Sequence, residues 1–450
     1  MLSITHTSKV ILATCNLNQW ALDFEGNLKR TIESIRIAKE RGARFRTGPE
    51  LELSGYSCED HFLEMDTYLH CNQSLAELLS TDITDSILCD IGCPILHEGV
   101  RYNCRVFCLN RKIILIRPKI SLADDGNYRE PRYFSGYKGI DSELQTYTIP
   151  DIITKVTGQT ICPFGFAIIK AYGTTIGAEC CEELWTTFNP HIPMYLSGVD
   201  IISNGSGSHH QLRKLNSRVE LVKGASKRGG GVYLFANHKG GDGGRLYFDG
   251  CCLICVNGDF VAQGSQFDVG DVEVITATID INDIYSYRQG FKATQEQSSS
   301  AVIKPLQTID ISSEFTLFIS NNTQSLITKA HTNTQLKFVQ NIHSSLCQCK
   351  YCHVTPPLET IRYHTTQEEC VLGPACWMWD YLRRSKASGF LVPLSGGADS
   401  ASVAAIIHVM SHLAINAANN GDKIVIDDLQ RLLNLPNNLE NIKNNNNNNN

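Results

Sequence analysis

Short apolar segments of strand character alternate with helix-like segments over the first 285 residues. The series begins with the apolar run at residues 10–13. Over residues 28–38, apolar side chains then recur at steps of three and four, which predicts one buried face of a helix. Gly42 follows where a C-terminal cap belongs. This order predicts an α/β fold built on a layered sheet or sandwich, with loops at the strand ends.

Further apolar segments indicate additional strands. We expect them at residues 105–116, 166–177, 200–203, 232–236 and 272–279. Asn257-Gly258 separates two apolar runs and is typical of a two-residue hairpin turn. Hairpins combined with crossovers indicate a sheet of mixed strand direction.

Charge and hydropathy exclude several classes of protein. The 450 residues include 46 acidic and 40 basic side chains, and the net charge of −6 argues against a general nucleic-acid-binding surface. Apolar runs such as residues 113–116 are far shorter than the roughly 20 residues of a membrane helix. Residues 1–10 lack a basic segment followed by an apolar one. We therefore expect a cytoplasmic protein with no membrane and no nucleic-acid partner.

The 18 cysteines are spread along the chain, and several lie inside apolar strand-like segments. Thiols in such positions are typical of small buried hydrophobes in a reducing cytosol. Cys347, Cys349 and Cys352, followed by His353, are spaced closely enough to hold zinc. Because no second ligand pair stands at metal-site spacing, we favour a loop without metal.

The pattern divides the chain into three parts. A first domain over residues 5–285 is followed by a polar linker over 286–359 and a second αβ segment over 360–450. In the second segment we expect an aromatic-rich helix at 377–386, a short strand at 390–394, a glycine turn and a helix from Ser400. Residues 444–450 are all asparagine, a low-complexity tail that cannot bury a core. We expect the chain to be a fragment of a longer protein or an interrupted gene model.

Three segments of the first domain place a carboxylate, an amine and a thiol after expected strands. These groups are Glu50, Lys119 and Cys181. Taken alone, each is explained as a surface charge or a buried thiol. Together they meet the needs of a thiol that attacks a carboxamide: a base, a cation for the oxyanion, and an acid that protonates departing ammonia.

These segments resemble the nitrilase (carbon-nitrogen hydrolase) superfamily, in the order Pro49-Glu50, Pro118-Lys119, Tyr128-Arg129-Glu130, Cys181-Glu182 and Trp185. The resemblance implies an N-terminal αββα sandwich. It also implies that Glu50 is the general base, Lys119 the transition-state stabiliser, Cys181 the nucleophile and Glu130 a supporting carboxylate. The family's nucleophile directly precedes a glutamate, which selects Cys181 over Cys180. Because adjacent strand residues face opposite sides, we expect Cys180 to point into packing.

A segment rich in glycine and hydroxyl groups follows the expected strand at 200–203, where a ligand can approach the backbone closely. A simple turn would explain the same composition. In glutamine-hydrolysing members of the superfamily, the equivalent loop contacts the amino-acid end of glutamine. The resemblance therefore implies glutamine contacts from Ser208 and Lys214, with Tyr128 from the earlier loop. His209 and His210 have no matching metal ligands nearby and are expected to be ordinary loop histidines.

A glycine-rich loop lies between the expected strand and helix of the second domain, with the residues Pro393, Leu394, Ser395, Gly396, Gly397, Ala398, Asp399 and Ser400. The glycines let backbone N–H groups turn towards an anion, and the start of the following helix adds its dipole. A glycine turn without a ligand is the alternative. The strand, loop and helix context favours a pyrophosphate cradle, which differs from a Walker loop because no Lys-Ser/Thr pair follows the glycines.

This loop resembles the SGGxDS loop of the ATP pyrophosphatase superfamily, which implies a truncated, Rossmann-like second domain, ATP as co-substrate and Asp399 as a ligand of Mg²⁺. With residues 18–27, 100–105 and 372–377, the two domains together are similar to the family of glutamine-dependent NAD⁺ synthetases. That family implies L-glutamine, ATP and nicotinic acid adenine dinucleotide as substrates, and a homo-oligomer. A stand-alone nitrilase-type amidase and a non-catalytic scaffold remain as alternatives, although an intact set of Glu50, Lys119 and Cys181 counts against the scaffold.

Overall fold

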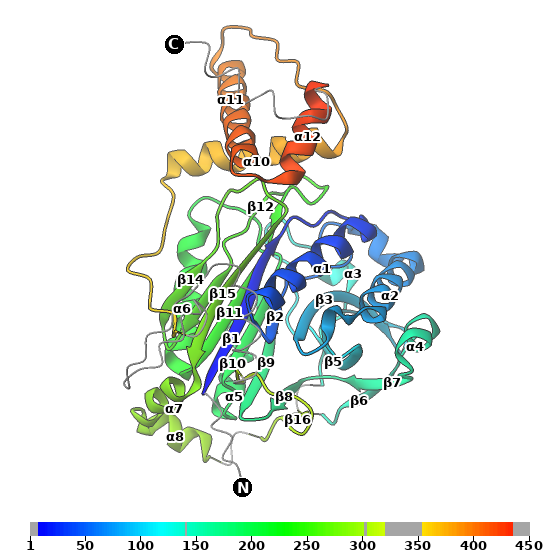
Figure 1. Ribbon diagram of the computed structural model, residues 1–450, viewed down its shortest axis with the longest axis vertical. Coiled ribbons are helices and arrows are strands. Elements are labelled where there is room, and N and C mark those ends of the chain that lie inside the picture. Colours follow the sequence, from blue (N-terminus) through cyan, green and yellow to red (C-terminus); the bar gives the residue numbers. More distant parts are fainter. Residues whose placement is uncertain (1–7, 140–141, 301–303, 320–352, 435–450) are drawn as a thin grey trace, which may run out of the picture.

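The computed structural model describes residues 8–139, 142–300, 304–319 and 353–434, and a curled sheet forms its centre (Figure 1). The described strands are β1 (Lys9–Leu17), β2 (Phe45–Thr47), β3 (Leu88–His97), β4 (Val100–Leu109), β5 (Lys112–Pro118), β6 (Gln145–Thr148), β7 (Ile161–Phe164), β8 (Ala167–Ala171), β9 (Thr174–Cys180), β10 (Ile201–Ser206), β11 (Val232–Gly240), β12 (Phe248–Asp249), β13 (Leu253–Val256), β14 (Asp259–Gln263), β15 (Val272–Asp280) and β16 (Gln307–Asp310).

Helices lie outside this sheet. The described α-helices are α1 (Phe24–Glu40), α2 (Met65–Ser80), α3 (Glu130–Tyr133), α4 (Asp151–Thr157), α5 (His191–Leu196), α6 (Lys214–Gly229), α7 (Ile281–Gln289), α8 (Lys292–Ser298), α10 (Thr366–Arg384), α11 (Ala398–Asn419) and α12 (Lys423–Leu433). Short 3₁₀ helices are η1 (Glu59–Leu63), η2 (Asp82–Thr84) and η3 (Cys181–Leu184). In Figure 1, α6 lies to the left of β1, and α1 and α2 lie to its right.

Strand direction determines where the loops meet. The strands β9, β10, β11, β1, β2 and β3 are consecutive neighbours, and each neighbouring pair is parallel. The antiparallel pairs β3–β4 and β4–β5 then return β5 to the same direction. Because parallel strands carry their carboxyl ends to one edge, the segments that follow β2, β5, β9 and β10 gather there.

Alternate residues of β1 face two separate layers of core. Ile11, Ala13 and Cys15 pack in the cluster that includes residues of α1, α2, α5 and α6. Val10 and Leu12 pack in a second cluster made mainly of strand residues. A strand has a side-chain period of two, so one face of the sheet is covered by helices and the other packs against sheet. These layers form the expected αββα sandwich.

Several sequence expectations for the first domain are confirmed. Helix α1 covers the periodic segment, and Asp23 caps it by accepting a hydrogen bond from the N–H of Gly26. Gly42 adopts the left-handed conformation expected of a cap, with φ of +80°. Asn257 and Gly258 form the turn between β13 and β14 with φ of +53° and +93°, as the hairpin pattern predicts.

Two expected long strands are instead hairpins. Residues 105–116 contain the end of β4 and most of β5, which pair antiparallel. Their turn is Asn110-Arg111, with φ of +48° and +63°. Residues 166–177 likewise contain β8 and part of β9. The expectation was wrong in the first case because Asn110 and Arg111 adopt positive φ without a glycine to mark the turn.

The segment expected to be a polar linker packs partly against the first domain. Strand β16 extends the sheet by pairing parallel with β8. Phe315 and Leu317 are buried in the strand-lined cluster. Isolated apolar residues within a polar stretch gave a weak pattern in the sequence, whereas docking against an existing sheet edge orders them. The cluster of Cys347, Cys349 and Cys352 lies outside the described residues.

The C-terminal part differs from expectation in the start of α10, at residues 390–394 and in the start of α11. Helix α10 begins at Thr366 rather than at residue 377, because Thr365 and Glu368 form a capping box ahead of Pro374. The strand expected at 390–394 is not formed, and Leu391 is 96% exposed. No strand in the described part of the chain lies beside it to accept its backbone hydrogen bonds. Helix α11, expected from Ser400, begins at Ala398.

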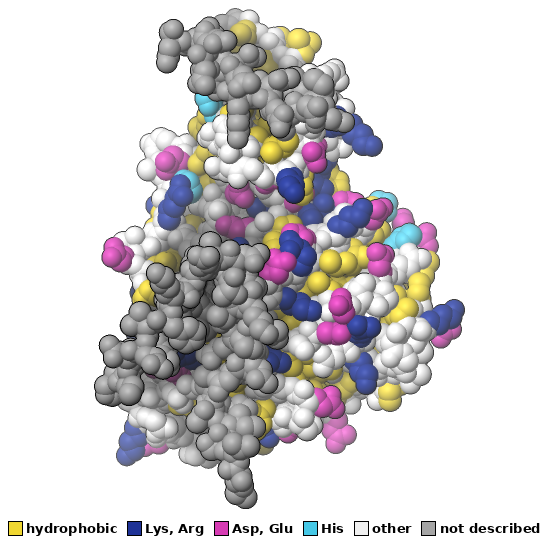
Figure 2. Space-filling view, in the orientation of Figure 1, with side chains coloured by type: hydrophobic (Ala, Val, Ile, Leu, Met, Phe, Trp, Pro, Cys, Tyr) yellow, Lys and Arg dark blue, Asp and Glu magenta, His cyan; other side chains and the backbone are white. Residues whose placement is uncertain are grey.

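Helix α11 is unusually apolar for its exposure. Its 22 residues include a window with mean hydropathy 1.5, and among the described residues it is the one helix that meets the length and composition of a membrane span. Core helices meet the same criteria, and Met410 and Ala414 pack with α10 and α12. Elsewhere, basic and acidic side chains are interspersed over the face seen in Figure 2.

Candidate active site

The sequence-predicted triad meets at the carboxyl edge of the sheet. Glu50 follows β2, Lys119 follows β5 and Cys181 follows β9. The three strands run in the same direction, which brings residues from distant parts of the chain to one edge. Glu50 and Lys119 are fully buried, and Cys181 is 2% exposed.

A buried charge network joins two carboxylates through one ammonium. Lys119 Nζ lies 2.6 Å from Glu50 Oε1 and 2.8 and 2.7 Å from the two carboxylate oxygens of Glu130. Asn103 Nδ2 donates a second hydrogen bond to Glu50 Oε1 at 2.8 Å, and the N–H of Gly207 donates to Oε2 at 3.1 Å. Such partners are required because an unpaired buried charge costs several kcal/mol.

The network gives Glu50 and Glu130 different pKa values. Burial raises the pKa of Glu50, but the charge of Lys119 and the hydrogen bonds outweigh it, so this pKa lies below its usual range. For Glu130, burial dominates over the opposing charge of Lys119 and raises the pKa to about 7. Burial lowers the pKa of Lys119, but Glu130 and Glu50 more than reverse this, so the lysine stays charged. Glu130 is thus the member that titrates near neutrality.

Cys181 occupies a strained position at the start of η3. Its φ is +41°, in the left-handed region that costs a non-glycine residue roughly 1–2 kcal/mol. The N–H of Cys181 donates to Asn204 Oδ1 at 3.0 Å, which helps to hold this conformation. Its thiol lines a cavity of about 390 Å³. Burial raises the pKa of this thiol far above its usual value, so thiolate formation needs a base.

Cys180 does not face away from the site, and that expectation was wrong. Its Sγ lies 3.3 Å from Glu50 Oε1. Strand alternation does not extend across the Cys180–Cys181 pair, because β9 ends at Cys180 and Cys181 begins η3 with a left-handed backbone. Cys181 lines the cavity, whereas Cys180 is not among its lining residues.

The cavity beside Cys181 carries charges of both signs and aromatic rings. Its lining includes Asp125, Glu182, Arg213, Lys214, Tyr128 and Trp185. Lys214 Nζ lies 5.4 Å from the ring centroid of Tyr128 and 5.6 Å from that of Trp185. Acidic and basic groups in one cavity suit a zwitterion, whose ammonium and carboxylate need opposite partners.

Of the three predicted glutamine contacts, Tyr128 and Lys214 line the cavity and Ser208 does not. Ser208 is 1% exposed, and its Oγ accepts a hydrogen bond from Arg218 Nη2 at 3.2 Å. Its N–H donates to Asn237 Oδ1 at 2.9 Å. The side chain of Ser208 is therefore engaged within the protein in this structure.

Sequence reasoning missed two groups that hold the triad together. Asn103, in β4, donates to Glu50. Glu183 accepts hydrogen bonds from the N–H of Cys180 at 2.8 Å and of Ile120 at 2.5 Å, and pairs with Arg117 at 2.7 Å. It therefore ties the residue after Lys119 to the residue before Cys181. A polar residue inside an apolar strand, as at Asn103, was the available signal.

The predicted phosphate loop is exposed and precedes α11. Gly396 has φ of +83°, and Ser395 Oγ lies 3.3 Å from Ser400 Oγ. Asp399 lies in the first turn of α11. Within the described ranges, no group of three His, Cys, Asp or Glu side chains could hold a metal ion by itself. A lone carboxylate still fits Mg²⁺, which binds through one or two carboxylates together with substrate phosphates.

The αββα sandwich, with a buried glutamate, lysine and cysteine at one sheet edge, defines the class of thiol-dependent enzymes that cleave carbon-nitrogen bonds. The family model described as carbon-nitrogen hydrolase matches residues 11–289. The chain belongs to the carbon-nitrogen hydrolase family.

Curated relatives extend the likeness beyond that domain. The glutamine-dependent NAD(+) synthetase of Dictyostelium discoideum is 50% identical over 428 residues, covering 95% of this chain and 55% of that protein. The protein of the same name from Saccharomyces cerevisiae is 50% identical over 423 residues, covering 94% and 55%. The chain thus spans about half the length of the curated relatives it matches.

Two solved structures share the fold. A glutamine-dependent NAD(+) synthetase from Cytophaga hutchinsonii has a TM-score of 0.66 and 22% identity, with 95% of this chain and 57% of that chain covered. One from Acinetobacter baumannii, in complex with adenosine diphosphate, has a TM-score of 0.61 and 19% identity, with 88% and 56% covered. At these identities the likeness concerns the fold.

Proposed function

We propose that this protein is a glutamine-hydrolysing NAD⁺ synthetase. Ammonia released from L-glutamine would amidate ATP-activated nicotinic acid adenine dinucleotide, giving NAD⁺, AMP, pyrophosphate and glutamate. The observation that carries the hydrolytic half is the network of Glu50, Lys119 and Glu130, with contacts of 2.6 to 2.8 Å, beside a cavity lined by Cys181. Relatives at 50% identity support the synthetic half and disfavour the stand-alone amidase and the scaffold.

Hydrolysis begins when Glu50 accepts the proton of the Cys181 thiol and the thiolate attacks the side-chain amide carbon of glutamine. The ammonium of Lys119 stabilises the charge that develops on the amide oxygen. Glu50 then returns its proton to the departing nitrogen, and ammonia leaves a glutamyl thioester. Water, deprotonated by Glu50, attacks the thioester, and glutamate leaves as the thiol is restored.

Charges in the cavity would select the amino-acid end of glutamine. The α-ammonium of the substrate would pair with Glu182 or Asp125, and the α-carboxylate with Lys214 or Arg213. Tyr128 supports Lys214 through its hydroxyl, which lies 3.3 Å from Nζ. Ser208 is 1% exposed and does not line the cavity, so it would contribute only if the site rearranged. Specificity for glutamine over a simple amide would then come from these four charges.

The second half of the activity uses ATP as co-substrate. The backbone of the loop 395–400 and its two serines would hold the pyrophosphate, and Asp399 would help to hold Mg²⁺ on the phosphates. The bound cation would neutralise phosphate charge during attack by the nicotinate carboxylate. We also propose a homo-oligomer in the cytoplasm. The cytoplasmic placement is supported by the described cysteines, which are free thiols, all but Cys370 buried.

The test is to compare glutamine with a simple aliphatic amide. We expect glutamate release from glutamine, with kcat/KM at least a hundredfold above that for propionamide. Ammonia and glutamate should form in equal amounts. Equal turnover of both amides would contradict the glutamine assignment and favour a general amidase, while no release from either would contradict an amide-hydrolysing site.

A further inference from the structure

We propose that Asp380 of α10 is a positioning residue for the amide-hydrolysing site, acting through the turn at residues 240–243 and through Tyr56. The inference rests on the proposed glutamine hydrolysis. It assigns to a helix outside the carbon-nitrogen hydrolase match, residues 11–289, a part in holding that domain's catalytic groups.

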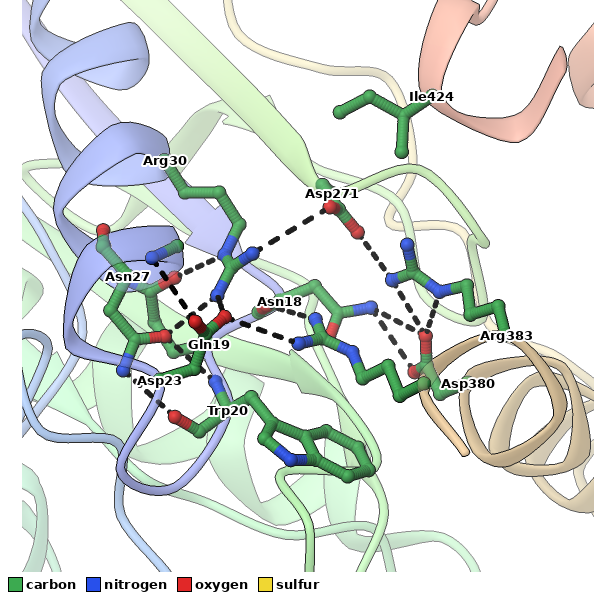
Figure 3. Close-up of polar contacts among 12 residues, drawn as sticks. Asn18, Gln19, Trp20, Asp23, Asn27, Arg30, Asp271, Asp380, Arg383 and Ile424 are labelled. Carbon is green, nitrogen blue, oxygen red and sulfur yellow. Dashed lines mark hydrogen bonds and ion pairs between the residues drawn. The ribbon is translucent and has the colours of Figure 1, made fainter. Parts of the chain in front are cut away.

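Asp380 lies in a buried polar junction between α10 and the end of β1 (Figure 3). Its carboxylate oxygens accept from Asn18 Nδ2 at 2.9 and 3.1 Å, and Oδ2 also accepts from the N–H of Gly241 at 3.0 Å. Arg383 Nε donates to Oδ1 at 2.9 Å. Asp380 is 2% exposed, so loss of its carboxylate would leave these donors without a partner and away from water.

The turn at residues 240–243, which Asp380 contacts, packs closely against α10. Gly240, Asp242 and Gly243 have φ of +89°, +47° and +78°. A Cβ on Gly240 would lie 2.2 Å from Asn18 Oδ1 and 2.5 Å from Asp380 Oδ2. The turn therefore keeps this conformation only in register with Asn18 and α10, and any shift of the Gly241 N–H would also move Asp242.

Asp242 carries the contact onward to the loop that contains Tyr56. Its Oδ2 accepts hydrogen bonds from the N–H groups of Tyr56 at 3.1 Å and Ser57 at 2.8 Å. Its Oδ1 is buried and has no hydrogen-bond partner among the described residues. A single oxygen thus holds both N–H groups, and burial raises the pKa of the Asp242 carboxyl to about 7.

Tyr56 completes the path to the catalytic ammonium. Its hydroxyl donates to Glu130 Oε1 at 2.5 Å, and Glu130 in turn binds Lys119. The Tyr56 ring also lies edge-on to Tyr128, with 6.1 Å between centroids. Each step from Asp380 to Lys119 is therefore a hydrogen bond or a chain neighbour, and the path reaches Glu130, which binds Lys119, and Tyr128, which lines the cavity.

The anchoring of α10 itself does not depend on Asp380 alone. Arg383 also pairs with Asp271, and Arg384 donates to the carbonyl oxygen of Asn18 at 2.7 Å and stacks on Trp20. Asp380→Ala and Asp271→Ala each remove one buried carboxylate from Arg383 and leave the other. They differ because only Asp380 accepts hydrogen bonds from Asn18 Nδ2 and from the N–H of Gly241, so Asp271→Ala is the control for the loss of a carboxylate partner of Arg383.

The experiment measures kcat/KM for glutamine in the full chain. We expect Asp380→Ala to lower it at least tenfold and Asp271→Ala less than threefold. Asp242→Ala should match Asp380→Ala, whereas Asp242→Asn should stay within threefold of wild type, because one amide oxygen can accept both N–H groups. If Asp380 acted only as a partner of Arg383, Asp380→Ala and Asp271→Ala would be equivalent, and that result would overturn the proposal.

A double variant tests whether Asp380 acts through Tyr56. We expect Asp380→Ala combined with Tyr56→Phe to be no more than threefold slower than the slower single variant, because both changes disturb the same support of Glu130. If the fold-losses in kcat/KM of the two single variants multiply in the double variant, the path through Tyr56 is overturned. If Asp380→Ala does not fold, as judged by thermal melting, the comparison of Asp242→Ala with Asp242→Asn decides the proposal.

A second readout separates this proposal from the proposed function. Alkylation of Cys181 by iodoacetamide, followed by peptide mass spectrometry, needs no glutamine turnover. We expect Asp380→Ala to slow alkylation at least fivefold relative to Asp271→Ala. If the wild-type protein releases no glutamate, the proposed function fails, and the alkylation ratio still decides the role of Asp380. Equal alkylation rates in both variants would overturn the positioning role.

Discussion

The thiol of Cys180 donates a hydrogen bond to Glu50, with 3.3 Å between Sγ and Oε1, while the neighbouring Cys181 lines the cavity. Glu50, the proposed general base, is therefore in contact with a thiol that does not line the cavity. The two cysteines differ in backbone as well, since only Cys181 has a positive φ. Contact with Glu50 and access to the cavity thus belong to different thiols.

Cys181→Ala should abolish glutamine hydrolysis, with a loss of more than about a thousandfold in kcat, because no nucleophile remains on the cavity. Cys180→Ala should keep most of the activity, since it removes one weak donor to Glu50 and leaves Lys119 and Asn103 in place. Glutamate release from both variants checks this. Equal loss, or loss only in Cys180→Ala, would show that the nucleophile is wrongly assigned.

Glu50→Gln should lower kcat by about 10²- to 10⁴-fold, the range typical of a lost general base. The amide keeps the size of the side chain, and Lys119 stays paired with Glu130, so the variant should fold. Thermal melting measures the fold and glutamate release measures the rate. A variant that melts normally and retains more than a tenth of wild-type kcat would contradict the role of Glu50.

Glu130 should impose an acid limb on kcat/KM with an apparent pKa near 7. Its pKa is raised to about 7 from the usual 4.5, and the ionised form holds Lys119. Activity should therefore rise with pH through neutrality, and Glu130→Gln should remove this limb. A limb unchanged in Glu130→Gln would assign the ionisation to another group.

The raised pKa of Glu130 also affects the free energy of unfolding, which should fall with rising pH where activity rises. Folded Glu130 binds its proton more tightly than the unfolded chain, so its stabilising contribution is complete below about pH 4.5 and is lost as pH rises through about 7. Urea unfolding of the wild type and Glu130→Gln at pH 5 and pH 8 measures this. The wild type should lose more stability than the variant between these two values.

Lys214→Met should raise the KM for glutamine at least tenfold and change kcat much less, because the lysine would bind the substrate carboxylate rather than the reacting amide. Lys223→Met, on the exposed surface of the same helix α6, is the control and should behave as wild type. Turnover of propionamide, which has no α-carboxylate, should be unaffected in both. An unchanged KM in Lys214→Met would remove this residue from the substrate site.

The two halves of the proposed activity should separate in a form of the protein as long as its curated relatives. Cys181→Ala should still make NAD⁺ when an ammonium salt replaces glutamine. Asp399→Ala should lose synthesis with either nitrogen source and still release glutamate, because it disturbs phosphate binding and leaves the thiol intact. Failure of ammonium to rescue a folded Cys181→Ala would contradict the two-site mechanism; normal synthesis by Asp399→Ala would contradict the phosphate loop.

The sequence was sufficient to predict that Glu50, Lys119 and Cys181 lie close together. Each residue belongs to a short segment that follows a strand, and parallel strands bring such segments to one edge of the sheet. It was insufficient where contacts depend on distant parts of the chain. Asn103 and Glu183 act through neighbours that only the folded sheet supplies. Likewise, the contact of Cys180 with Glu50 depends on the turn at Cys181, which strand alternation cannot predict.

In the C-terminal segment, residues 360–450, the sequence predicted a strand that the structure does not form. Residues 390–394 have the composition of a buried parallel strand, but a strand forms only beside another, and none lies beside it among the described residues. Helix α11 needs no such neighbour, since its backbone hydrogen bonds are internal, and it forms as predicted.

The left-handed backbone at Cys181 means that a thiol at this position lowers the stability of the fold relative to glycine. Glycine would adopt the same φ without strain, so Cys181→Gly should unfold at higher denaturant concentration than Cys181→Ala. The thiol is therefore held at a thermodynamic disadvantage relative to glycine, and the proposed role of Cys181 as the nucleophile accounts for a side chain at this position.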